Sequence, residues 1–463
     1  MVQESFEPER DESERPEPES TGAERADEGR SGSERAESNG QAEPEDVLRP
    51  TDADQDDVPP PEPRTWRTRG DYIAVAVITA AVLVTSLVLW RTSDAVGTTS
   101  QTGPSSIAPL EPAIVLPPSL AEAWRAPSGA TPVPVNLDSV VVTGDGGEVV
   151  GHDALTGEVR WRYNRDIPLC TVSTTWGKVI AAHTKGTNCS EIETLDLASG
   201  KRGPQRNGDA ETGTRLLAEG SHVVTTGDTY FEVYRRDDLV KALEYGQLRA
   251  IVNPNKQPRT GCTYHSFAVT QGKIAIIERC YAQENADRLT ILKPNPEKND
   301  EPQVLASVVV GGKGAQVVAI SPTKVAVALP GRLEVYESET AGKVADYPVE
   351  ATAADLEDQP GKVAQTATST ANVYWHVGTR TIALQVNDLN PVWTKEDTRG
   401  PGTTIAGRAL IPVRDGLKVV DQLTGAEIGT IPVDRGGYTG PIAMATEGPV
   451  VLEQRGDTLV ALR

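Results

Sequence analysis

Residues 153–161 read Asp-Ala-Leu-Thr-Gly-Glu-Val-Arg-Trp and follow an alternating run at 139–151. The stretch has the form of a strand, an Asp-x-x-Thr-Gly turn and a second strand that ends in Trp. Relaxed copies recur, since Asp196-Leu-Ala-Ser-Gly200 lies 43 residues on and Asp421-Gln-Leu-Thr-Gly425 lies 268 residues on. The longer distance is about six periods of roughly 45 residues, and repeats of this length with several strands each predict a β-propeller.

The repeated pattern continues from residue 120 to the C-terminus as short β-rich runs between Gly, Asn and Asp turns, without sustained helical periodicity. Seven units are visible. Their second and third strands are expected at 139–143 and 147–152, 178–183 and 191–197, 222–226 and 230–235, 273–279 and 288–292, 324–329 and 332–337, 372–377 and 380–386, and 409–413 and 417–421.

The last segment, 441–462, supplies only about three strands, and the missing strand is available at 121–124, which reads Ala-Glu-Ala-Trp like the strands that end other units. Pairing the first strand with the last segment closes the ring and removes two exposed sheet edges. We therefore expect an all-β, eight-bladed propeller. Seven blades remain the alternative, because units four and six match the turn pattern poorly.

The N-terminal residues 1–63 are built from Glu, Asp, Ser, Pro, Gly and Arg, with 21 acidic residues against 6 arginines. Such a segment cannot bury enough apolar surface to offset the entropy lost on folding, so we expect a disordered acidic cytoplasmic tail. Of the net charge of −21, the tail carries −15 and the rest of the chain −6. A nearly neutral folded part without a basic block predicts no nucleic-acid partner.

Residues 72–90 contain no charged side chain, with three arginines shortly before them and Arg91 directly after them. A helix of this length spans about 28 Å, which matches the hydrocarbon core of a bilayer, so we expect a transmembrane helix at 71–91. The excess of arginine on the N-terminal side places the N-terminus in the cytoplasm. The chain is thus expected to be a single-pass protein of the cell (inner) membrane with its propeller outside the cytoplasm.

Residues 92–118 hold Thr, Ser, Gly and Pro around short apolar pieces. This composition suits an extended linker that holds the propeller, residues 119–463, near the membrane.

The four cysteines are Cys170, Cys189, Cys262 and Cys280. None forms a Cys-x-x-Cys pair of the kind used in zinc or thiol redox sites. A location outside the cytoplasm favours two disulfides, and four buried reduced thiols are the alternative.

The Asp-x-x-Thr-Gly-x-x-x-Trp pattern resembles the PQQ-like, or quinoprotein-like, propeller repeat from about residue 120 to the C-terminus. The whole organisation, an acidic tail, one membrane helix and an external propeller, also resembles actinobacterial cell-envelope proteins of the polar growth factor A type. That resemblance implies a role in trehalose monomycolate trafficking and polar growth beside a mycolate transporter.

Chemistry of the quinoprotein kind is not expected. Quinoprotein dehydrogenases, which share the repeat that this chain resembles, use an adjacent pair of cysteines and an acidic, calcium-binding site beneath the cofactor. The chain has no adjacent cysteines. It also lacks Gly-x-Ser-x-Gly and His-Glu-x-x-His, and its five histidines fall in different units. We expect no enzyme, cofactor or metal, although propeller loops can bring distant residues together.

The propeller register predicts the disulfide pairing. The start of a blade's first strand lies beside the end of its second strand, because the two are antiparallel neighbours. Cys170 and Cys262 open units two and four, whereas Cys189 follows the second strand of unit two and Cys280 ends the second strand of unit four. We therefore expect the pairs Cys170–Cys189 and Cys262–Cys280.

The longest departure from the repeat is residues 247–260, inserted between units three and four. By resemblance, such connections lie on a face where propellers commonly bind ligands. Positive and amide side chains in this loop could meet a partner or sugar hydroxyls; a packed surface loop is the alternative. The candidate residues are Arg249, Asn253, Asn255, Lys256 and Arg259.

The function that these patterns favour is a non-enzymatic scaffold or binding module in envelope assembly, which binds a partner protein such as a mycolate transporter and a possible glycolipid. A ligand sensor that signals to the cytoplasm and a quinoprotein-like enzyme are the competing hypotheses.

Overall fold

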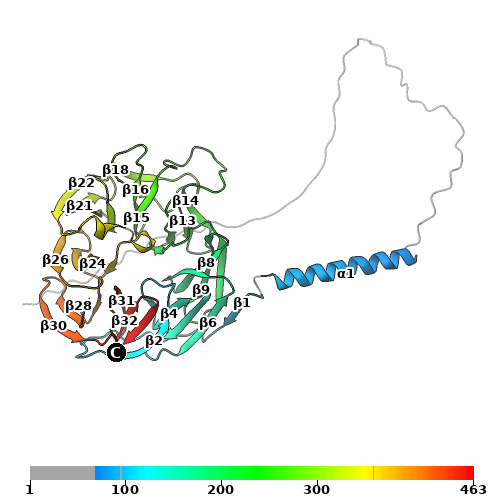
Figure 1. The fold of residues 1–463 in the computed structure, drawn as a ribbon, viewed down its shortest axis with the longest axis horizontal. Coiled ribbons are helices and arrows are strands. Elements are labelled where there is room, and N and C mark those ends of the chain that lie inside the picture. The colour runs from blue at the N-terminus through cyan, green and yellow to red at the C-terminus, as the bar shows by residue number, and fades with distance from the viewer. Residues whose placement is uncertain (1–67, 94–95, 358) are drawn as a thin grey trace, which may run out of the picture. The chain divides into compact units, whose positions relative to one another are not determined.

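The described residues form one α-helix and a ring of β-sheets (Figure 1). The computed structural model describes residues 68–93, 96–357 and 359–463. Contacts separate two compact units at residue 75, within the helix. The acidic tail expected at 1–63 lies outside the described residues.

Helix α1 runs from Arg69 to Arg91, and none of its residues is buried. A reciprocal cap starts it: the Thr68 amide donates to Asp71 Oδ2 at 2.9 Å, and the Asp71 amide donates to Thr68 Oγ1 at 3.3 Å. Among the described residues, this is the one helix long and apolar enough to cross a membrane. Helix α1 is therefore consistent with anchoring in a membrane by a single span.

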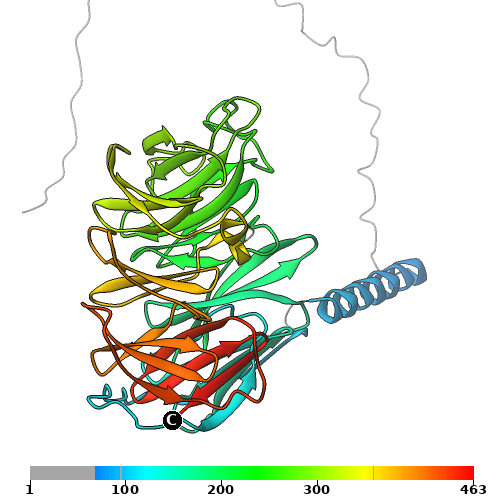
Figure 2. The same ribbon diagram turned by 60° about the vertical axis from the view of Figure 1, so that its left-hand side comes forward.

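Eight antiparallel sheets form the propeller, which confirms the eight-bladed prediction over the seven-bladed alternative. The first strands of most neighbouring blades contact one another around the centre, and Figure 2 shows the stacked sheets in a second view. Every pair of second and third strands expected from the sequence is present. Hydrophobic cores form between blades; one joins Ala326 and Leu333 of blade five to Trp375 and Leu384 of blade six.

Blade one comprises β3 (Val135–Leu137), β4 (Val140–Asp145), β5 (Glu148–Asp153) and β6 (Val159–Arg165), and blade two comprises β7 (Leu169–Thr175), β8 (Lys178–Lys185), β9 (Asn188–Asp196) and β10 (Arg202–Asn207). Blade three comprises β11 (Leu216–Ala218), β12 (His222–Thr225), β13 (Tyr230–Arg235) and β14 (Lys241–Gly246), and blade four comprises β15 (Thr263–Thr270), β16 (Lys273–Arg279), β17 (Arg288–Leu292) and β18 (Val304–Val309). Blade five comprises β19 (Gln316–Ile320), β20 (Lys324–Leu329), β21 (Arg332–Glu337) and β22 (Lys343–Pro348), and blade six comprises β23 (Thr366–Thr368), β24 (Asn372–Val377), β25 (Arg380–Gln385) and β26 (Pro391–Lys395). Blade seven comprises β27 (Thr403–Ile405), β28 (Arg408–Val413), β29 (Gly416–Asp421) and β30 (Glu427–Pro432), and blade eight comprises β31 (Ile442–Glu447), β32 (Val450–Arg455), β33 (Thr458–Leu462) and β2 (Glu122–Pro127). The remaining elements are β1 (Thr98–Gln101) and the 3₁₀ helices η1 (Ala354–Leu356) and η2 (Pro360–Lys362).

The ring closes as the sequence predicts. Strand β2, which holds Trp124, pairs antiparallel with β33 at the C-terminus and completes blade eight. The N-terminal strand of the propeller thus covers an edge that an open array would leave exposed.

The repeated turn and the repeated Trp join neighbouring blades. Trp161 Nε1 of blade one donates to the carbonyl oxygen of Leu197, next to Asp196 in the turn of blade two, at 2.9 Å. Trp124 and Trp393 make the equivalent bonds to Ala154 and Gln422, at 3.0 and 2.9 Å. Each Trp therefore fastens one blade to the turn of the next.

Glycine is required in these turns for two reasons. Gly200 has a φ of 67°, which disfavours other residues. A Cβ atom there would also lie 2.6 Å from the Trp161 ring. Within the turn of blade one, Asp153 Oδ1 accepts the backbone amides of Leu155 and Thr156, each at 3.0 Å. Asp, Thr and Gly thus shape the corner on which the Trp packs.

The linker contributes a strand to the propeller. Strand β1 pairs with β6 as a fifth strand of blade one, and the two run side by side in Figure 1. Farther on, the Gly103 amide donates to Ser199 O at 2.9 Å, and Ser139 Oγ donates to Ala108 O at 2.8 Å. The segment is extended, but it is docked on the propeller because the outer edge of β6 offers unpaired backbone groups.

Both disulfides join the expected cysteines, Cys170 with Cys189 and Cys262 with Cys280. The second pair brackets β15 and β16, whose end residues Thr263 and Arg279 are register partners. In the first pair the register differs slightly from the expectation, because Cys189 is the second residue of the third strand, β9.

Candidate functional site

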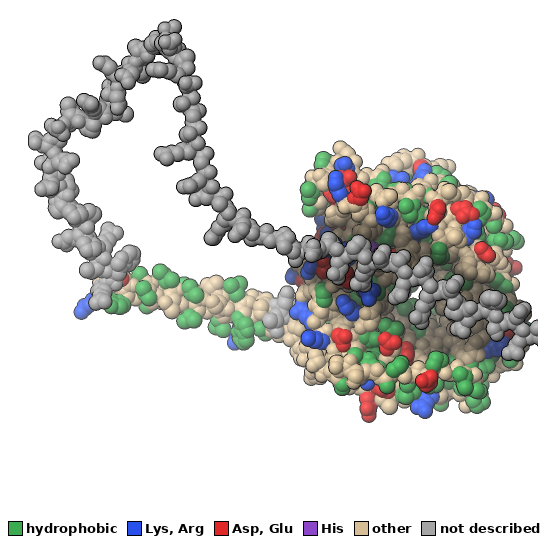
Figure 3. Space-filling model, turned by 180° about the vertical axis from the view of Figure 1, so that it is seen from behind, with side chains coloured by type: hydrophobic (Ala, Val, Ile, Leu, Met, Phe, Trp, Pro, Cys, Tyr) green, Lys and Arg blue, Asp and Glu red, His purple; other side chains and the backbone are tan. Residues whose placement is uncertain are grey.

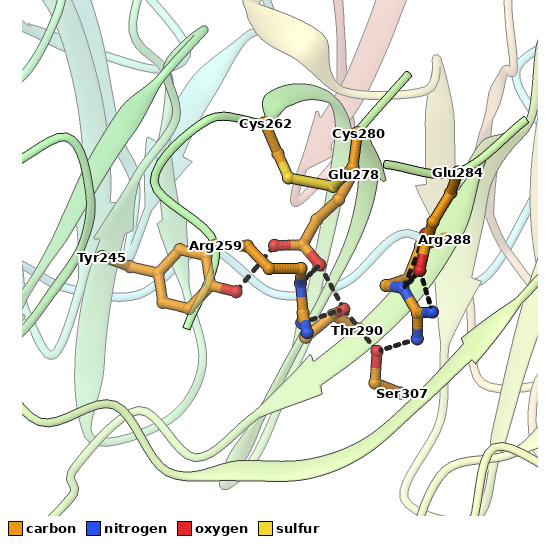
Figure 4. The surroundings of a disulfide bond; sticks show 9 residues. All are labelled: Tyr245, Arg259, Cys262, Glu278, Cys280, Glu284, Arg288, Thr290 and Ser307. Carbon is orange, nitrogen blue, oxygen red and sulfur yellow. Dashed lines mark hydrogen bonds and ion pairs between the residues drawn. A yellow bond between two sulfur atoms is a disulfide. The ribbon is translucent and has the colours of Figure 1, made fainter. Parts of the chain in front are cut away.

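The inserted loop at 247–260 is held to the propeller by its charged residues. Figure 4 shows Arg259 turned toward the Glu278 carboxylate, next to the Cys262–Cys280 disulfide. Arg259 Nε donates to Glu278 Oε2 at 2.7 Å, and its Nη2 donates to Thr290 Oγ1 at 2.9 Å. Because Glu278 is fully buried, Arg259 anchors the loop rather than facing solvent.

The other candidate residues of the loop also have partners. Arg249 contacts Asn188 and lies 3.6 Å from Asp209 Oδ1. Asn253 Nδ2 donates to Asp300 Oδ2 at 2.7 Å, and Lys256 Nζ lies 3.3 Å from Glu301 Oε1. The fifth candidate, Asn255, is exposed and has a φ of 63°, a conformation typical of a turn. The five candidate side chains do not point toward one common position where a ligand could bind.

Sequence reasoning missed the apolar tip of this loop. Ile251 and Val252 are 67% and 80% exposed. Ile251 lines a hollow of about 440 Å³ together with Leu248, Pro254 and Thr260. The signal in the sequence was the apolar run Ala-Ile-Val at 250–252 in an otherwise polar stretch. Because Arg249, Lys256 and Arg259 are each paired with a carboxylate, the exposed apolar tip is the part of the loop that is available to a partner.

A second hollow lies in the centre of the ring. It has a volume of about 600 Å³ and is lined by the first strands of several blades, and the face seen in Figure 3 is hollowed near its middle. Its size is that of pockets for small molecules. Its walls include Val133, Leu217, Val363, Ala364, Ala443 and Met444, with threonines at 366, 368, 403, 404 and 446.

An insertion between blades five and six, residues 349–365, forms part of this wall. It carries η1 and η2, which lie inside the ring in Figure 1. Leu356 is fully buried, and its carbonyl oxygen contacts Nε2 of His265 in blade four at 3.0 Å. The Gly361 carbonyl accepts from Thr226 Oγ1 of blade three at 2.7 Å. The insertion therefore contacts blades three and four on the inner side of the ring.

One acidic cluster has the spacing of metal ligands. Asp209, Glu232 and Glu244 bring carboxylate oxygens within 4.8 Å of one another, the one such group in the part of the chain that the structure describes. Lys241 Nζ lies 2.6 Å from Glu244 Oε1 and 3.7 Å from carboxylate oxygens of both other residues. Tyr230 also donates to Glu232. An ammonium and a phenol thus already compensate these carboxylates.

A Ser–His–Glu contact in blade three lacks the geometry of a nucleophilic triad. Ser221 Oγ and Glu219 Oε1 both contact Nδ1 of His222, at 2.9 and 2.7 Å. A triad needs the acid and the nucleophile on opposite ring nitrogens, so that the ring can pass a proton between them. This arrangement orients the ring but does not activate the serine.

Three other histidines are held neutral inside the blades. Burial lowers the pKa of His183, His265 and His376 to about 4. Arg279 and Lys362 lower the pKa of His265 further, while the bond to Leu356 opposes them. Histidines in this state couple the stability of the fold to pH.

We expect the propeller to lose stability as the pH falls from 6.5 toward 4. In this window the unfolded chain binds protons on these histidines and the folded chain does not, so each histidine contributes stability that is complete above pH 6.5 and is lost below it. The loss is about 3 kcal/mol per buried histidine. Chemical unfolding of the full chain at pH 7 and pH 4.5 measures it. His265→Gln should show a smaller loss than the unaltered chain; equal losses would contradict the assignment.

The comparisons with solved structures concern the fold. The chain is similar to a computationally designed protein, Ika8, with a TM-score of 0.51 and 13% identity over 74% of this chain and 99% of that chain. It is also similar to BamB from Moraxella catarrhalis, with a TM-score of 0.49 and 13% identity over 74% of this chain and 99% of that one. Quinohemoprotein alcohol dehydrogenase from Comamonas testosteroni gives a TM-score of 0.47 and 12% identity over 74% and 76% of the two chains.

No family model matches the chain, and no curated protein sequence matches it. At identities this low the likeness concerns the β-propeller fold alone.

Proposed function

We propose that this chain is a membrane-anchored, non-enzymatic binding module whose propeller docks another protein through the apolar tip of the 247–260 loop. The observation that carries the proposal is the contrast within the loop. Its cations are paired with acidic groups of the propeller, while Ile251 and Val252 remain 67% and 80% exposed. Apolar side chains presented on an anchored loop are typical anchors of protein interfaces.

Membrane anchoring limits the class of protein that can be the partner. Helix α1 supplies the candidate span, and the arginines before it favour a cytoplasmic N-terminus with the propeller outside. The proposed partner is therefore a membrane protein with an external apolar pocket. The resemblance of the whole organisation to the polar growth factor A type suggests a mycolate transporter and a role in trehalose monomycolate trafficking during envelope assembly.

The docking proposal is tested by site-specific photocrosslinking in intact cells. A photoreactive residue at position 252 should capture the transporter. The double change Ile251→Ser and Val252→Ser should reduce co-purification of the two full-length proteins by about tenfold or more, because each apolar anchor of an interface contributes about 2 kcal/mol or more to binding.

The matched control is Leu423, which is 71% exposed in the turn of blade seven. A photoreactive residue at 423 should not capture the transporter, and Leu423→Ser should leave co-purification unchanged. Equal capture from both positions, or unaltered co-purification after the double change, would contradict docking through the loop tip.

A further inference from the structure

Among the described residues that line the central cavity, one has a charged side chain: Arg215, which precedes β11 of blade three. Its side chain is half-buried, and its guanidinium makes no hydrogen bond or ion pair with the described residues. Burial lowers the pKa of Arg215 to about 10. A desolvated guanidinium without a counter-charge is energetically unfavourable, and an anion that enters the cavity would relieve that cost.

The backbone around Arg215 holds the side chain in place. Its own amide donates to Thr226 Oγ1 at 2.9 Å, and the same hydroxyl donates to the Gly361 carbonyl. A Cβ atom on Gly361 would lie 2.0 Å from Arg215 Cγ, so η2 packs directly on the aliphatic stem of the arginine. The guanidinium is therefore positioned by a blade on one side and by the insertion on the other.

The rest of the lining sets the chemistry of the occupant. Among the residues that the structure describes, the cavity wall includes no Asp, Glu or Lys beside Arg215. Valine, proline, alanine and methionine side chains supply apolar surface, and threonine hydroxyls and two glutamines supply neutral polar groups. A ligand that fits this wall has one negative charge and an otherwise neutral, largely apolar body.

We propose that the central cavity binds an amphiphile with a single anionic headgroup, a carboxylate or a phosphate ester, whose charge pairs with the guanidinium of Arg215. The planar fork of arginine suits both headgroups, because two of its N–H groups can donate to two oxygens of either anion. The volume of about 600 Å³ leaves room for the apolar body beside the headgroup. This inference does not depend on the protein partner assigned to the 247–260 loop.

The test uses the full chain in nanodiscs of zwitterionic lipid and measures binding by titration calorimetry, with empty nanodiscs subtracted. Octanoate and octyl phosphate are the anionic probes, and octanol is the neutral probe. Both anions or one of them should bind, and the tighter one identifies the headgroup class. Arg215→Gln should weaken binding of the anions by about tenfold or more, since a hydrogen-bonded charge pair contributes that much. Arg215→Lys should retain part of the affinity.

The matched control is Arg236→Gln, which removes an exposed arginine from the same blade and should leave binding unchanged. Ala443→Phe, which narrows the cavity, should weaken all probes that enter it. Thermal unfolding of each variant verifies that it folds. The proposal is overturned if neither anion binds, if Arg215→Gln binds them as the unaltered chain does, or if octanol binds as tightly as the anions. None of these outcomes bears on crosslinking at position 252.

Discussion

Replacing Trp161 with alanine is expected to lower the free energy of unfolding by about 3–5 kcal/mol. The side chain is 1% exposed, so its removal leaves a large cavity between blades one and two. It also removes the Nε1 donor from the Leu197 carbonyl and the ring against which Gly200 packs. Denaturant unfolding of the full chain measures the change.

Three further variants separate the causes. Trp161→Phe keeps an aromatic ring and loses the donor, so it should cost less than the alanine change. Gly200→Ala should destabilise the unaltered chain, because the new Cβ meets the ring at 2.6 Å, but part of that cost should vanish in the Trp161→Ala background. Leu423→Ala, at an exposed turn position, should stay within about 0.5 kcal/mol. Equal and additive costs in both backgrounds would contradict a direct Trp–turn contact.

The same Trp contact explains why the fold could be predicted from this sequence. The Asp-x-x-Thr-Gly turn and the Trp strand interact between neighbouring blades, so the constraint repeats with the blade and leaves a periodic trace. The register that follows from it also located the two disulfides and the closing strand β2. A local contact that recurs in successive blades can therefore be recognised from the sequence alone.

The candidate sites were less predictable because they depend on contacts between distant segments. Arg249 and Arg259 look alike in sequence, yet Arg259 is paired with a buried glutamate 19 residues away. Arg215 lies in an unremarkable segment before β11 and becomes a candidate only because blade three and the 349–365 insertion meet at the centre. The docking of β1 on β6 likewise depends on which edge of blade one is open.

Buried glutamates between blades were also absent from the sequence-based expectations, and Glu453 gives the second large predicted effect. Glu453 in β32 is fully buried. It accepts from Arg435 Nη2 at 2.8 Å and from Arg455 Nε at 2.7 Å. Arg435 also donates to the Val413 and Gly416 carbonyls of blade seven, at 2.8 and 3.1 Å. The carboxylate thus neutralises two buried guanidiniums, one of which ties blade seven to blade eight.

Glu453→Gln is expected to lower the free energy of unfolding by about 3–5 kcal/mol, because it removes one charge and leaves two like charges buried together. Denaturant unfolding at pH 7 measures the loss. The matched control is Glu427→Gln, which breaks ion pairs of 3.2 Å with Lys395 and Lys418 at the surface and should cost about 1 kcal/mol or less. A second change, Arg455→Met in the Glu453→Gln chain, should recover part of the loss by removing one uncompensated charge. If both glutamates cost the same, or if Arg455→Met deepens the loss, the carboxylate does not act through charge compensation between the blades.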